Sequence, residues 1–218
     1  MSVGKEFALL FGVLFLPGML AQGGDVDPQS FESIRYQIQL LAVAIPQILL
    51  VVTFSDLRRP GSSRRFGWRR PDRGDLISAF VGITGVLAVV WAVSILAGII
   101  TSGGEGTEPV IDWSFERWEL IPLVLVSTMA IGYREEIFYR AYITDRAEEA
   151  GVDPRFALAG GALLFAAGHV YQGVMGFVIA LAIGLLLGAV YLKGRSLHGI
   201  AVAHGLYNFL VLLGSASA

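Results

Sequence analysis

Ionisable side chains occur at three places inside long apolar stretches of this sequence. The first place is the stretch 133–140, where two glutamates are adjacent and an arginine follows one turn later. Charged groups inside a membrane span are energetically costly, so the default interpretation is a functional site whose polar groups meet one another. The candidate site residues are Glu135, Glu136, Arg140, His169, His204 and Asn208.

These side chains supply carboxylates, imidazoles and an amide, and the sequence contains no cysteine. Hydroxyl groups occur in the same apolar stretches at Ser127 and Thr128, but neither stands in the sequence context of an activated nucleophile. Water is therefore the expected nucleophile, with a carboxylate as its general base. A histidine and an asparagine can donate hydrogen bonds to a developing oxyanion. Together these groups could hydrolyse a peptide bond.

A zinc site is the alternative use of the same residues. Glu135, His169 and His204 are acceptable zinc ligands that would leave one coordination position open. The arrangement His-Glu-x-x-His is missing, and the three ligands would come from different helices. The residues alone leave both a metal-free and a zinc-dependent hydrolase open.

The spacing of the candidates supports a shared site. Residues four apart lie on one face of a helix. The sequence contains three such pairs, which are Glu136 with Arg140, Phe165 with His169, and His204 with Asn208. A turn is expected at 151–154, and Glu135 and His169 lie at nearly equal numbers of residues before and after it. The rise of an antiparallel helix pair would therefore bring these two residues to about the same depth.

Composition sets the class of protein that must position these groups. The chain has 218 residues, of which 55% are hydrophobic and 16% charged, and the charges gather between long apolar stretches. This pattern predicts an all-α transmembrane helix bundle of about seven spans (six to eight), which forms a single integral membrane domain over 1–218. The net charge of -2 gives no indication of nucleic-acid binding.

The charges between the apolar stretches predict a topology. The loop 55–74 carries seven arginines, so we expect it, and the N-terminus, on the cytoplasmic side of a cell membrane. The acidic loop 101–117 is then outside, and the charged stretch 145–149 should protrude into the cytoplasm. The expected helices are 7–20, 36–54, 76–100, 118–150, 156–170, 173–192 and 197–213. The first is expected to be an uncleaved helix, with a signal peptide as the alternative.

Four other residues carry weaker expectations. His198 lies beside a short basic turn and is expected at the surface or the membrane interface. Trp68 and Trp118 are typical interfacial anchors. Arg134 is expected either to help neutralise Glu135 or to reach a polar cavity.

The three motifs resemble a family of intramembrane proteases that includes the CAAX prenyl endopeptidases and bacteriocin-processing proteins, often called the CPBP or Abi family. The family pattern is Glu-Glu-x-x-x-Arg, then Phe-x-x-x-His, then His-x-x-x-Asn/Asp on successive membrane helices. In this sequence the pattern stands at 135–140, 165–169 and 204–208, in the same order and spacing. The resemblance covers about 118–213, which would be the catalytic helices of the family core.

The resemblance implies a role for each matching position. Glu135 would be the general base on water, and His169 would position that water. His204 and Asn208 would stabilise the oxyanion. The remaining matches would support the structure, with Glu136 paired to Arg140 and Phe165 as a packing residue. The resemblance favours a glutamate-dependent reaction without a metal cofactor, with zinc as the alternative.

The function implied is cleavage of a membrane-associated protein or peptide within the lipid bilayer. Two other classes of function fit a polar site inside a helix bundle. One is a transporter or binding protein that holds an ion or proton there, and the other is a membrane scaffold without catalytic activity. Cleavage that depends on Glu135 and His169 would distinguish the protease from both.

Overall fold

The structure is a computed structural model, and it describes residues 2–20, 32–101 and 117–214. These residues form helices and short turns, and none of them lies in a strand. The helices are α1 (Val3–Leu14), α2 (Leu16–Leu20), α3 (Ile34–Arg58), α4 (Ser62–Arg65), α5 (Arg73–Thr101), α6 (Ile121–Glu136), α7 (Ile143–Glu149), α8 (Pro154–Ala167), α9 (Gly173–Gly194) and α10 (Leu197–Gly214). A π-helical segment (Ile137–Tyr142) joins α6 to α7 without a break.

The expected class of fold, an all-α membrane bundle, is confirmed. By length and composition, three helical stretches could cross a membrane, which are Ile34–Arg58, Arg73–Gly98 and Val170–Gly194. Two shorter apolar helices, Pro154–Ala167 and Leu197–Leu213, accompany them. The count of seven spans stays a prediction. Most of the acidic loop 101–117 lies outside the described residues.

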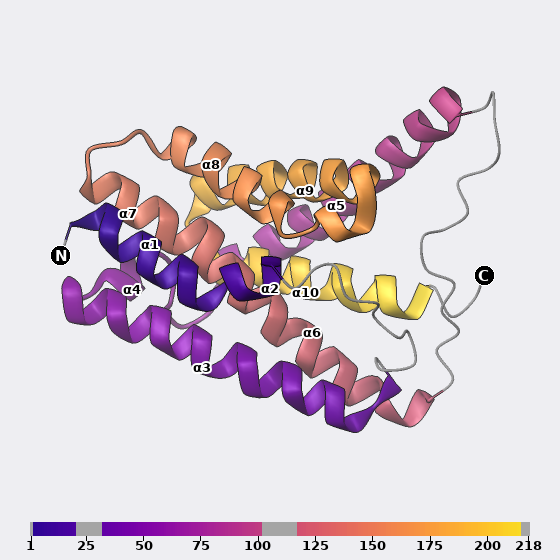
Figure 1. The fold of residues 1–218 in the computed structure, drawn as a ribbon, viewed down its shortest axis with the longest axis horizontal. Coiled ribbons are helices and arrows are strands. Elements are labelled where there is room, and N and C mark those ends of the chain that lie inside the picture. The colour runs from indigo at the N-terminus through magenta and orange to yellow at the C-terminus, as the bar shows by residue number, and fades with distance from the viewer. Residues whose placement is uncertain (1, 21–31, 102–116, 215–218) are drawn as a thin grey trace.

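The helices of the bundle run along one long axis (Figure 1). Helix α10 packs against both α6 and α5, and α3 packs against the other side of α6. Helix α8 pairs with α9, which also contacts α5. The core between them is apolar and aromatic, and side chains such as Ile137, Phe138, Leu187 and Ile200 are fully buried in it. The π-helical segment contributes to this core along its whole length.

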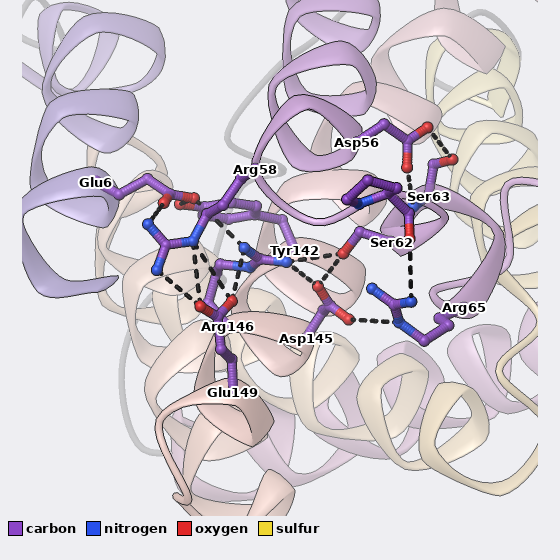
Figure 2. Close-up of polar contacts among 11 residues, drawn as sticks. Glu6, Asp56, Arg58, Ser62, Ser63, Arg65, Tyr142, Asp145, Arg146 and Glu149 are labelled. Atoms are coloured by element: carbon purple, nitrogen blue, oxygen red, sulfur yellow. Dashed lines mark hydrogen bonds and ion pairs between the residues drawn. The ribbon is translucent and has the colours of Figure 1, made fainter. Parts of the chain in front are cut away.

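A buried polar cluster holds α1 against α3 and α7 (Figure 2). Glu6 of α1 is fully buried, and one of its carboxylate oxygens lies 2.7 Å from Nη1 of Arg58. Its other oxygen accepts a hydrogen bond of 3.0 Å from the Tyr142 hydroxyl and lies 3.8 Å from Nη1 of Arg146. Arg58 also donates to Glu149 at 2.7 Å. That hydrogen bond, followed by the charge of Arg146, holds the pKa of the Glu149 carboxyl below its usual range.

The charged stretch 145–149 was expected to protrude into the cytoplasm, and its side relative to the membrane stays a prediction. The side chains in its first half are buried within the protein. Asp145 and Arg146 are buried and form an ion pair with each other. The hydroxyl of Ser62 in α4 donates to Asp145 and accepts a hydrogen bond of 2.7 Å from Arg146 (Figure 2). Helices α1 and α4 therefore cover this part of α7 and supply partners for its charges. Glu149 at the end of α7 is only partly buried.

Candidate active site

The two adjacent glutamates occupy different environments at the end of α6. Glu136 is fully buried, and its Oε1 accepts a hydrogen bond of 2.9 Å from Nη1 of Arg140. The same oxygen lies 2.7 Å from Nδ1 of His204, which comes from α10. Arginine is always charged in proteins, so it provides a counter-charge for Glu136 in this buried place. Glu136 is thus fixed by two partners, and the pairing with Arg140 that its spacing predicted is present.

Glu135 is held more loosely than Glu136. Its side chain is 15% exposed, and its Oε2 lies 3.5 Å from Nε2 of His204. Its Oε1 lies 3.9 Å from Nη1 of Arg134. These distances are longer than ordinary hydrogen bonds, so the carboxylate has electrostatic partners and remains able to bind a water molecule. The His204 ring therefore lies between the two carboxylates, with one nitrogen directed at each.

The π-helical segment sets the position of Arg140 within this group. The Arg140 guanidinium lies over the ring of Phe165 in α8, 4.5 Å from its centroid. The wider turn brings the backbone of this segment close to α8 at Gly161, where an added Cβ would lie 2.5 Å from the Tyr139 carbonyl oxygen. A glycine is therefore required at this approach. Such π-helical segments occur frequently at functional sites.

His169 lies just outside α8, whereas the sequence predicted that it belongs to the helix. The helix ends at Ala167, and His169 has φ −117° and precedes a short 3₁₀ turn. Even so, Nδ1 of His169 lies 2.8 Å from the Phe165 carbonyl oxygen, so the predicted neighbours do contact each other. The His169 ring is partly exposed.

Phe165 connects the remaining members of the site. Its ring lies 4.5 Å from the His169 ring and 5.5 Å from the His204 ring, measured between centroids. The structure thus joins Glu135, Glu136, Arg140 and His204 by polar contacts, and His169 reaches them through the aromatic ring. Asn208 lies one turn beyond His204 on α10 and is partly exposed. It takes no part in the hydrogen bonds described above.

The zinc alternative requires Glu135, His169 and His204 to converge on one point. Across residues 2–20, 32–101 and 117–214, no three histidine, aspartate or glutamate side chains are grouped so that they could hold a metal ion. Glu135 and His204 approach each other, but His169 does not join them as a third ligand. Nδ1 of His204 is also already paired with Glu136. This arrangement does not fit the predicted zinc site.

His198 is more enclosed than its expected position at the surface suggested. Its Nδ1 lies 2.9 Å from the Tyr133 hydroxyl, and its Nε2 lies 2.5 Å from the Arg69 carbonyl oxygen. Trp68, expected as an interfacial anchor, packs against the rings of both His198 and Tyr133.

A cavity of about 420 Å³ between α5 and α10 is lined by Tyr133, His198 and Asp75. None of the four predicted catalytic residues lines it, so it is separate from the candidate site.

Arg134 lies beside Glu135, as the first of its two expectations proposed, and its other polar partners belong to neighbouring helices. It forms the long ion pair with Glu135, and it also contacts α1 and α3. The polar partners in α1 and α3 are functional candidates that sequence reasoning missed. Their distance along the chain from Arg134 leaves no local signal that could have identified them.

The fold and the site together define a helical membrane protein with a polar site inside its bundle. Residues 117–210 match the family described as Rce1-like, type II CAAX prenyl endopeptidase Rce1-like. Over this part of the chain the match confirms the resemblance to the CAAX-type intramembrane proteases. No curated protein and no solved structure matched the chain.

Proposed function

We propose that this protein is an intramembrane endopeptidase that hydrolyses a peptide bond of a membrane-associated protein or peptide, with Glu135 as the general base on water. One observation carries the proposal. Of two adjacent glutamates, Glu136 is fixed by Arg140 and His204, whereas Glu135 has only long contacts and is partly exposed. A general base must bind and deprotonate a water molecule, which requires an oxygen that is not already occupied.

In the proposed reaction the Glu135 carboxylate takes a proton from water while the water oxygen attacks the carbonyl carbon of the substrate. His169, at the partly exposed end of α8, positions this water. When His204 is protonated, Nδ1 donates to Glu136 and Nε2 is a donor for the developing oxyanion. Asn208 lies one turn away on the same helix and is the second donor. The proton on Glu135 then passes to the leaving amine as the C–N bond breaks.

The role of Glu136 in this proposal is indirect. Its Oε1 holds the Nδ1 side of the His204 ring, so Nε2 stays directed toward Glu135 and the substrate. Arg140 in turn holds Glu136 and lies on the Phe165 ring. The three residues thus fix the orientation of His204 and take no part in bond making.

We further propose a multi-pass protein in a cell membrane with seven spans. The N-terminus and the loop 55–74 are on the cytoplasmic side, because arginines beside spans favour that side. In this segment, Arg58 and Arg69 are used in ion pairs, whereas Arg59, Arg64 and Arg70 are exposed. The exposed arginines can face the negatively charged cytoplasmic leaflet.

Cleavage of a membrane-embedded peptide by the purified protein in liposomes tests the proposal. We expect Glu135→Gln and His169→Ala to lower kcat by at least about a hundredfold, because each removes a group that acts on water. Glu119→Gln is the matched control, since Glu119 is exposed in the 3₁₀ turn that precedes α6. Full activity of both site variants would show that the mechanism is wrong. A transporter would instead show substrate flux without cleavage.

Two further measurements define the reaction. Matched peptides with and without a prenyl group test whether this chain requires the substrate named in the family description. Metal analysis of the active protein, together with chelator treatment, tests the metal-free reaction. Loss of activity on chelation that is restored by zinc alone would favour the zinc-dependent alternative.

A further inference from the structure

The guanidinium group of Arg134 is held from three directions next to Glu135. Its Nε donates to the side-chain oxygen of Gln47 in α3, and its Nη2 donates to the Leu14 carbonyl oxygen at 3.1 Å. The group also lies over the Phe15 ring, 4.6 Å from the ring centroid. Its Nη1 remains directed toward Glu135, 3.9 Å from Oε1. Its side chain is 18% exposed, so solvent screening of this charge is limited.

The Leu14 carbonyl can accept this hydrogen bond because α1 ends there. Pro17 has no backbone N–H, and its ring conflicts with the carbonyl of Val13 four positions earlier, so it disfavours a continuous helix at this point. The backbone changes direction at Phe15, with φ −121°, before α2 begins. The side-chain amide of Gln47 donates to the same Leu14 oxygen at 3.4 Å. The break between α1 and α2 therefore creates an acceptor that Arg134 and Gln47 share.

We propose that Arg134 is a positioning residue that orients the Glu135 carboxylate, and that α1 and α3 hold it in place through Leu14 and Gln47. This inference rests on the proposed function, since it assigns a partner to the same general base. It also means that helices outside the family match at 117–210 complete the active site. The opposite charge about 4 Å away attracts the carboxylate, and three fixed contacts keep that charge on one side of it.

Four variants of the full-length protein test this inference by steady-state cleavage in liposomes. Arg134→Gln removes the charge and should lower kcat by about tenfold to a hundredfold with little change in KM, because a misplaced base affects the chemical step. Arg134→Lys keeps the charge but loses the forked contacts, and should recover a large part of kcat. Gln47→Leu should lower kcat in the same direction by a smaller factor. Gln39→Leu, at an exposed position of the same helix, is the control and should match the wild type.

The outcomes separate this inference from the proposed function. Equal losses in Arg134→Lys and Arg134→Gln would show that Arg134 only ties helices together, and would overturn the inference. Wild-type kcat in Gln47→Leu would overturn the anchoring by α3, and this variant remains informative if Arg134→Gln does not fold. If Glu135→Gln is inactive while Arg134→Gln is fully active, the inference fails and the proposed function stands. If Glu135→Gln is active, the proposed function itself fails.

Discussion

The two adjacent glutamates lie in different environments, so the same substitution should affect different properties at each. Glu136→Gln should mainly lower the stability of the fold, whereas Glu135→Gln should mainly abolish cleavage. Glu136→Gln removes the negative charge beside Arg140, whose side chain is only 2% exposed. Leaving one partner of a buried ion pair without its counter-charge costs about 3–5 kcal/mol. Glu135→Gln breaks only contacts of 3.5 and 3.9 Å at a partly exposed position, and should cost less than about 1 kcal/mol.

Thermal unfolding in detergent, followed by tryptophan fluorescence, measures this difference. For a chain of this size, about 2–4 °C in Tm corresponds to 1 kcal/mol, so Glu136→Gln should lower Tm by about 6–20 °C. Glu135→Gln should leave Tm within a few degrees of the wild type while abolishing cleavage. The double variant Glu136→Leu/Arg140→Met removes both charges and should recover part of the loss. A larger fall in Tm for Glu135→Gln than for Glu136→Gln would refute the assignment of structure to one residue and chemistry to the other.

Three more predictions concern the elements around the site. Gly161→Ala should cost about 1–3 kcal/mol because its Cβ would meet the π-helical backbone, whereas Gly160→Ala, with open space around it, should be neutral or stabilising in the same unfolding assay. Glu6→Ala should lower Tm by an amount equivalent to about 3–5 kcal/mol, whereas the exposed Lys5→Ala should not. The lowered pKa of Glu149 stabilises the fold above the usual value of 4.5, and this contribution is lost as the pH falls through the lower folded value. The Tm difference between the wild type and Glu149→Gln should therefore be largest near pH 7 and shrink below about pH 4.5.

The helices of the bundle could be predicted because their ends carry strong local signals. The stretch expected at 197–213 is α10 (Leu197–Gly214), and the stretch expected at 173–192 is α9 (Gly173–Gly194). Arginine, glycine or proline stands at each of the boundaries between apolar runs. The pair of Glu136 with Arg140 was also predictable, because residues four apart on one helix meet whatever surrounds them.

Contacts between helices could not be predicted in the same way. The sequence paired His204 with Asn208 on its own helix, whereas the structure places its ring between Glu135 and Glu136 of α6. That contact depends on the rotation and depth of α10 against α6, which no local pattern specifies. The burial of Arg146 was missed for the same reason, since its partners lie in segments far away in the chain.

The π-helical segment is the feature that relates these long-range contacts to the site. Each residue of an α-helix turns the chain by about 100° around the helix axis. The extra residue in a π turn therefore rotates the directions of all later side chains by about that angle. Glu135 and Glu136 precede the segment and face α10, whereas Tyr142 and Arg146 lie at or beyond its end and face α1 and α4. In a continuous α-helix, Tyr142 and Arg146 would point about 100° away from their present directions. The buried cluster around Glu6 therefore fixes the far end of the same helix whose near end carries the proposed base, and α1 contributes to both ends.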